Sequence, residues 1–157
     1  MSEGPRDHVR EGRCQCGACR YRLEAKPFVV YACHCRECQR LTASAFLVCM
    51  QVPAEGLSIQ AGAPVRNRRV ADSGNVLDTW FCPTCGSSLY AQNSARPRVR
   101  TVHVGTLVRP EAEEVTAHIW VKRRLPWVVI PGSHRVFEGP GNWTADYARD
   151  PTRYRPA

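Results

Sequence analysis

The stretch Cys33-His34-Cys35-Arg36-Glu37-Cys38 places three cysteines in the spacing C-x-C-x-x-C. Two cysteines separated by one residue on an extended segment project from the same face of the chain. A C-x-x-C pair closed by a tight turn also brings its two sulfurs together. Thiolates grouped in this way bind a tetrahedral zinc ion at Zn–S distances of about 2.3 Å. The stretch therefore predicts a metal site around which the neighbouring chain is arranged.

Two further cysteine clusters flank this stretch, one before it and one after it. They are a second C-x-C-x-x-C triplet and a single C-x-x-C pair, formed by Cys14, Cys16, Cys19, Cys82 and Cys85. Pro83 and Gly86 supply the turn residues that a zinc knuckle of this kind needs. The polar residues 1–13 contain no apolar signal segment, so we expect a cytoplasmic protein in which clustered cysteines bind metal rather than form disulfides.

The pair Cys82 and Cys85 needs two more thiolates to complete a four-cysteine zinc site. They come from the first triplet or from the middle one. The first triplet offers Cys14 with Cys16 or Cys16 with Cys19, and the spacing leaves both choices open. A zinc ion bound in this way closes a loop of roughly 70 residues and contributes directly to the folding free energy. We therefore expect this site to be structural.

The middle triplet is then left with three thiolates, and three protein ligands with an open fourth position are typical of catalytic zinc. A thiol that binds at such a position loses its proton, so the pattern predicts a thiol substrate better than it predicts hydrolysis. In the alternative interpretation, His34 or Cys49 completes the shell and the site is structural. His34 lies between two ligands, so we expect its side chain to point away from the metal.

Composition indicates a basic, non-membrane protein of one domain. The 157 residues carry 22 basic and 14 acidic side chains, and the balance stays positive after seven thiolates and two zinc ions are counted. A positive balance suits anionic ligands. Arg36 and Arg40 either steer the carboxylates of a ligand or, in the alternative interpretation that we favour, are ordinary surface charges. No apolar run is long enough for a membrane span, so no membrane partner is expected.

Short apolar stretches separated by turn residues predict a mostly β domain. The expected strands lie at 13–23 with a corner at Gly17, and at 28–32, 44–51, 57–59, 65–70, 76–81, 88–91, 99–104, 118–121 and 126–131. A helical period is visible only around 36–41. We expect a flexible N-terminal tail at 1–10, and an extended tail at 139–157 that packs on the domain or on a partner.

Several segments together match a known pattern. They are Cys14 to Ala18, Cys33 to Phe46, Phe81 to Tyr90, Val104-Gly105-Thr106-Leu107, His118-Ile119-Trp120 and Pro126-Trp127. In this order they cover about residues 11–138, and the chain resembles the glutathione-dependent formaldehyde-activating (GFA) family, which includes centromere protein V. The resemblance implies a β-tent fold of small packed antiparallel sheets around zinc, in a GFA-type zinc domain at 11–138.

The resemblance also implies an assignment of ligands and an activity. Two zinc ions are implied, a structural one held by Cys14, Cys16, Cys82 and Cys85, and a catalytic one held by Cys33, Cys35 and Cys38. Cys19 is then a core residue or a spare thiol. The implied reaction joins the glutathione thiol to formaldehyde, giving S-hydroxymethylglutathione, and is classed as a carbon–sulfur lyase reaction. Ala43 in place of a common glycine, and Val108-Arg109-Pro110 in place of acidic residues, leave a similar thiol or another small aldehyde open.

A second hypothesis is a non-enzymatic zinc module that binds nucleic acid or a protein. It rests on basic clusters at 66–69, 96–100 and 122–124. None of the three is interleaved with aromatic residues that would stack on bases, so a nucleic-acid partner is not expected. The sequence leaves the oligomeric state open, with a homodimer among the options.

Overall fold

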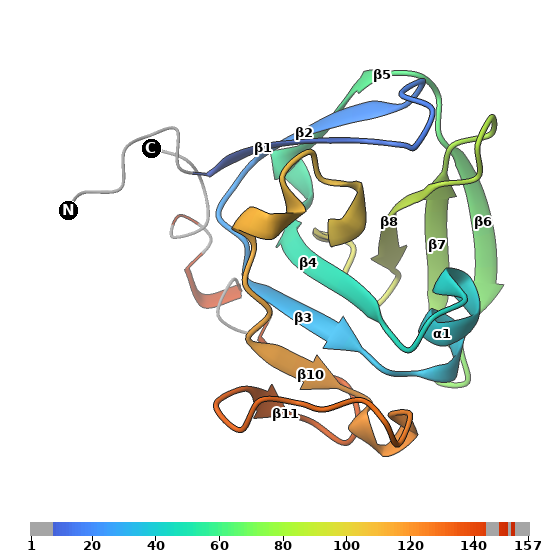
Figure 1. The fold of residues 1–157 in the computed structure, drawn as a ribbon. Helices are drawn as coiled ribbons and strands as arrows, with labels where there is room; N and C mark the ends of the chain where they lie inside the picture. The colour runs from blue at the N-terminus through green and yellow to red at the C-terminus, as the bar shows by residue number, and fades with distance from the viewer. Residues whose placement is uncertain (1–7, 144–147, 151, 153–157) are drawn as a thin grey trace.

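The computed structural model describes residues 8–143, 148–150 and 152, whose strands form two sheets (Figure 1). The smaller sheet has the order β1-β2-β5 and is antiparallel. Its strands are β1 (Val9–Arg13), β2 (Arg20–Glu24) and β5 (Leu57–Ala61). The expectation of a mostly β fold built from small sheets is confirmed.

The larger sheet has the order β11-β10-β3-β4-β9-β8-β7-β6. Its strands are β3 (Val29–Cys33), β4 (Leu47–Pro53), β6 (Val65–Val70), β7 (Val76–Phe81), β8 (Ser88–Asn93), β9 (Val99–His103), β10 (Ala117–Ile119) and β11 (Arg135–Val136). Strand β10 runs parallel to both β3 and β11, and the other pairs are antiparallel. Figure 1 shows β6, β7 and β8 running at a steep angle to β3 and β4.

Helical structure is short and lies in the connections. The α-helix α1 (Arg36–Thr42) follows β3, as the helical period around 36–41 predicted. The 3₁₀ turns are η1 (Ala54–Gly56), η2 (Val104–Thr106), η3 (Pro110–Ala112) and η4 (Val121–Arg123).

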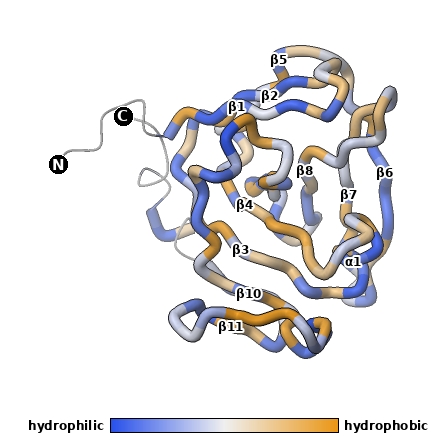
Figure 2. Tube along the Cα trace, viewed as in Figure 1, coloured by the Kyte–Doolittle hydropathy of each residue, from blue (hydrophilic) through white to orange (hydrophobic). Residues whose placement is uncertain are grey.

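Strand β3 is buried along its whole length because both of its faces are covered. Val30, with Met50 of β4, belongs to a core cluster that reaches the smaller sheet at Leu23. Tyr31, with Cys49 of β4, belongs to a second cluster on the opposite face. This division follows from the alternation of side chains along a strand. Figure 2 shows the contrast between hydrophobic β3 and β4 and the largely hydrophilic edge strand β6.

The structure corrects the predicted strand at 13–23, which is two strands joined by a turn. Gly17 takes a left-handed conformation with φ +80°, and the Gly17 N–H donates to the Cys14 carbonyl at 3.1 Å. β1 begins at Val9, two residues inside the predicted tail. The strand predicted at 118–121 ends at Ile119 because Trp120 has φ +56°. The strand predicted at 126–131 is wrong, since those residues form turns and irregular backbone.

Trp143 joins the predicted C-terminal tail to the second core cluster. Its side chain is 6% exposed, and its ring centroid lies 4.9 Å from that of Tyr31. The Trp143 Nε1–H donates to Gln51 Oε1 at 2.9 Å. The tail therefore packs on the domain at this residue, whereas residues 144–147, 151 and 153–157 lie outside the described part of the chain.

Replacing Trp143 by alanine is expected to destabilise the protein by about 3–5 kcal/mol, because a large buried ring is lost. Replacing it by phenylalanine keeps ring contact but leaves Gln51 Oε1 without its donor, at a cost of about 1–3 kcal/mol. Urea unfolding of the metal-loaded protein measures both values. Equal stability of the two variants and the wild type would show that this contact does not hold the tail.

Candidate metal centres

The first group of sulfurs comes from the β1–β2 turn and from the turn between β7 and β8. The Sγ atoms of Cys14, Cys16, Cys82 and Cys85 all lie within 4.8 Å of one another. Cys16 Sγ lies 3.5 Å from Cys14 Sγ and 3.8 Å from Cys82 Sγ. Four thiolates around one zinc ion at tetrahedral geometry are about 3.8 Å apart. The donor set and spacing therefore fit a four-thiolate zinc site.

Hydrogen bonds from the two turns favour thiolates in this group. The Cys19 N–H donates to Cys14 Sγ at 3.2 Å, and Ser87 Oγ lies 3.2 Å from Cys85 Sγ. The hydrogen bond with Ser87 is the largest cause that lowers the pKa of Cys85 to about 5. Gly86 allows this turn because its φ is +77°. The hydrogen bond with Ser87 thus favours negative sulfur at Cys85.

Cys19 lies outside the first group although it belongs to the same triplet. Of the two pairings that the spacing left open, the structure brings together Cys14 and Cys16. The Cys19 side chain is 1% exposed and packs in the first core cluster. Burial raises the pKa of Cys19 to about 11, which keeps it a neutral thiol. Cys19 is therefore placed as a core residue.

The second group of sulfurs lies where β3 passes into α1. The Sγ atoms of Cys33, Cys35 and Cys38 lie within 4.8 Å of one another. Cys35 caps the N-terminus of α1, and its Sγ accepts from the Cys38 N–H at 3.3 Å. Hydrogen bonds from Cys33 and Cys38 lower the pKa of Cys35, and backbone N–H groups contribute further. Cys35 and Cys38 are partly exposed, so this group is open to a ligand.

Neither alternative fourth ligand joins the second group. The group found among residues 8–143 contains three sulfurs only. His34 turns away, and its Nε2 lies 2.9 Å from His118 Nδ1. Cys49 is buried in β4 with its Sγ 3.8 Å from the Leu47 carbonyl oxygen. The direction predicted for His34 is therefore correct.

His34 begins a row of three histidines that the sequence analysis missed. His118 Nε2 lies 3.1 Å from His134 Nδ1, and consecutive rings are stacked with centroids 5.2 and 5.3 Å apart. Burial is the main cause that lowers the pKa of His34 to about 4, so this imidazole is neutral at pH 7. The row links the segment of the second cysteine group to the loop after β10. No spacing signal connects these three positions, because β-strand pairing brings them together.

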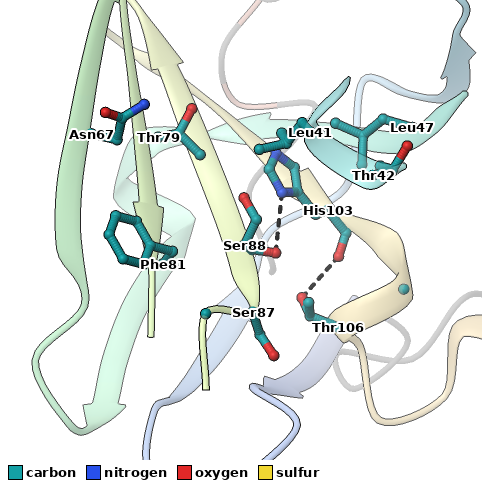
Figure 3. A pocket seen from close by; sticks show the side chains of 12 residues that line it. Leu41, Thr42, Leu47, Asn67, Thr79, Phe81, Ser87, Ser88, His103 and Thr106 are labelled. Carbon is teal, nitrogen blue, oxygen red and sulfur yellow. Dashed lines mark hydrogen bonds between the residues drawn. The ribbon is translucent and has the colours of Figure 1, made fainter. Parts of the chain in front are cut away.

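A cleft of about 550 Å³ is lined in part by α1 and by the turn that follows β7, two elements that also carry cysteines of the two groups (Figure 3). Its lining comes from α1, from strands β4 and β6 to β9, and from the turns that follow β7 and β9. The lining residues are Leu41, Thr42, Leu47, Asn67, Thr79, Phe81, Gly86, Ser87, Ser88, His103, Gly105 and Thr106. No motif in the sequence indicates this set, because its members come from segments far apart in the chain.

The cleft adjoins the second cysteine group on one face of α1. Cys38, Leu41 and Thr42 share a helix face because residues three and four apart are neighbours there. Thr42 Oγ1 donates to the Cys38 carbonyl at 2.9 Å. Leu47 pairs in register with Cys33 across β3 and β4, so both side chains leave the sheet on the same side. The cleft therefore lies on the helix face that carries Cys38 and on the sheet side that carries Cys33, although none of its lining residues is a cysteine.

The predicted carboxylate-steering arginines lie on another face of α1. Arg36 and Arg40 line a separate, more open hollow beside Trp127. Each already has a partner on the helix, because Arg36 donates to Gln39 Oε1 and Arg40 pairs with Glu37. The structure thus places neither arginine in the cleft.

His103 has a fixed tautomer at the cleft. Its Nδ1 lies 3.1 Å from the Ser88 carbonyl oxygen, which accepts only, so Nδ1 carries the proton and Nε2 is an acceptor. Figure 3 shows the second ring nitrogen on the side of Leu41. Burial lowers the pKa of His103 to about 4. The ring is therefore neutral at physiological pH.

Folding stability is expected to fall between pH 7 and pH 5 through His103. The folded state has the lowered pKa, so the unfolded state binds more protons in the window from 6.5 down to about 4, and stability is lost as pH falls. Between pH 7 and pH 5, the free energy of unfolding of the wild type should fall by about 2 kcal/mol more than that of His103→Gln. Urea unfolding at both pH values measures this difference. Protonation of the cysteines affects both proteins equally and therefore cancels. Identical pH profiles would contradict the burial of a neutral imidazole.

Among the described residues, no helix is long and apolar enough to cross a membrane. The curated protein sequences contain no match to this chain. The chain is similar in fold to a protein of Rhodobacter sphaeroides of known crystal structure, with a TM-score of 0.52 and 23% sequence identity. The similarity covers 67% of this chain and 96% of that one.

The sequence profile of one family matches residues 9–123, which contain both cysteine groups and most of the larger sheet. That family is described as glutathione-dependent formaldehyde-activating enzyme. The match covers well over half of the chain, and it spans all seven cysteines that the fold gathers into two groups. The chain therefore belongs to the glutathione-dependent formaldehyde-activating enzyme family.

Proposed function

We propose that the chain is a zinc-dependent carbon–sulfur lyase that joins glutathione, or a similar thiol, to formaldehyde or another small aldehyde. Cys14, Cys16, Cys82 and Cys85 would hold one structural zinc ion, and Cys33, Cys35 and Cys38 the second. The observation that carries the proposal is the second group, in which three sulfurs gather beside a cleft while His34 and Cys49 turn elsewhere. Family membership supports the thiol and the aldehyde.

The chemistry needs a deprotonated sulfur next to room for an aldehyde. An ion held by three thiolates supplies an open position that accepts one more sulfur and favours its deprotonated form. In the reaction a sulfur lone pair forms the S–C bond, the C=O π electrons move to oxygen, and that oxygen takes up one proton. The thiol releases one proton when its sulfur is deprotonated, so the addition is balanced. Cys35 and Cys38 are partly exposed, which leaves an incoming thiol access to this group.

Calorimetric titration of glutathione into the zinc-loaded protein tests binding. We expect heat of binding that disappears once a chelator has removed the second ion. NMR exchange between formaldehyde and S-hydroxymethylglutathione then tests catalysis, with an exchange rate above that of the uncatalysed mixture. Binding without faster exchange would leave a thiol-binding module and overturn the assignment as a lyase.

The alternative of a nucleic-acid module draws less support from the fold. In the basic cluster at 66–69, Arg68 donates to both carboxylate oxygens of Asp78 at 2.7 and 2.8 Å. Arg66 also lies near this carboxylate, at 3.7 Å. Part of the charge on β6 is therefore neutralised within the domain. Duplex DNA binding that weakens steeply with salt would favour the alternative.

A further inference from the structure

We infer that the cleft beside the second cysteine group binds the uncharged, hydrogen-bonding part of a thiol next to its sulfur, such as the amide groups on either side of the glutathione cysteine, and that His103 is the residue that positions this part. The inference rests on the proposed function and narrows its substrate class. It concerns the part of the thiol that extends away from the sulfur, over β9, β8 and β7.

The lining of the cleft is polar but uncharged. Of the twelve residues that the structure describes around it, none has a charged side chain. Hydrogen-bonding groups come instead from Asn67, Thr79, Ser87, Ser88 and Thr106, next to the apolar side chains of Leu41, Leu47 and Phe81.

The basic residues next to Asn67 in the sequence are directed away from the cleft. Arg66 and Arg68 flank Asn67 on β6, so their side chains leave the strand on the opposite face. Both lie by Asp78, on the face opposite the cleft. Arg69 shares the face of Asn67 but is not part of the lining. A carboxylate in the cleft would therefore lose water without gaining a cation, which is costly.

One acceptor at the cleft can receive a hydrogen bond from a thiol body. His103 Nε2 is this acceptor, because the Ser88 carbonyl oxygen holds the proton on Nδ1. An amide N–H or a hydroxyl of the bound molecule can donate to it. The site thus matches amide or hydroxyl groups.

A matched pair of thiols tests the selection on the wild-type, zinc-loaded protein. N-acetylcysteine and N-acetylcysteine amide have nearly the same shape and differ in one carboxylate. Calorimetric titration is expected to give a Kd at least about tenfold lower for the amide. Equal affinities, or tighter binding of the acid, would overturn the inference and leave the proposed function standing. If neither compound nor glutathione binds, the proposed function itself fails.

Two variants test the role of His103. Asparagine at this position keeps a donor near the Ser88 carbonyl but removes the acceptor, whereas glutamine places an amide near Nε2. His103→Asn is expected to raise the Kd of N-acetylcysteine amide about tenfold. For the much smaller 2-mercaptoethanol, the factor by which the Kd rises should be at least about five times smaller. His103→Gln should recover most of the lost affinity. Equal weakening of both thiols, or no recovery with glutamine, would show a merely structural role and overturn the assignment of His103.

Discussion

Replacing Cys82 by serine is expected to remove one bound zinc ion and to leave most of the protein unfolded. Cys82 is completely buried and its sulfur belongs to the four-sulfur group. That group connects the β1–β2 turn to the turn after β7, and it lies against the first core cluster. A structural zinc site contributes about 10–16 kcal/mol in small domains, which is as large as the whole stability of about 5–15 kcal/mol that is typical of folded proteins.

Metal analysis and circular dichroism measure this outcome, and Cys19→Ser is the matched control. Cys19 is as deeply buried, belongs to the same core cluster and lies outside the group of sulfurs. We expect Cys19→Ser to keep two ions per chain and to cost about 1–3 kcal/mol for placing a hydroxyl in an apolar site. A folded Cys82→Ser protein with two ions would contradict the structural role of the first site.

The triplet of the second group and the C-x-x-C pair of the first were predictable because their spacing is local, whereas the union of Cys14 and Cys16 with that pair was implied by the family resemblance. In C-x-C and C-x-x-C pairs, neighbouring sulfurs are brought together by one turn of backbone, whichever sheet surrounds them. The choice between Cys14 with Cys16 and Cys16 with Cys19 was not predictable from spacing. It depends on the left-handed turn at Gly17, which sends the Cys19 side chain into the core.

The cleft and the histidine row were not predictable, because they depend on pairing between distant strands. His103 meets the cleft through the pairing of β9 with β4 and β8. His34 meets His118 through the parallel pairing of β3 with β10. These positions are isolated polar residues in strands or, for His34, directly after one, and alternation alone does not say which strand lies beside them. The irregular backbone at 126–131 was missed for a related reason, since an apolar run resembles a strand even when no partner strand is available.

Replacing Cys35 by serine is expected to leave the fold intact while removing the second ion and thiol binding. The serine hydroxyl can still accept the Cys38 N–H, because serine is a favourable N-cap residue for α1. The sulfur itself is lost, and Cys35 is the member of the group whose pKa is lowered by hydrogen bonds from both other cysteines. With two thiolates left, we expect affinity for the second ion to fall at least about a hundredfold.

Cys49→Ser separates loss of the metal from loss of a buried thiol. Cys49 is 2% exposed, packs in the same core cluster as Cys33 and lies outside the group of three sulfurs. Burying a hydroxyl there costs about 1–3 kcal/mol of stability, yet two ions per chain and the heat of glutathione binding should remain. Cys35→Ser should show the reverse. Its free energy of unfolding should stay near that of the wild type, but it should bind one ion per chain and give no heat of glutathione binding. If Cys35→Ser keeps both ions, another donor completes the site, and the open position on which thiol binding depends does not exist.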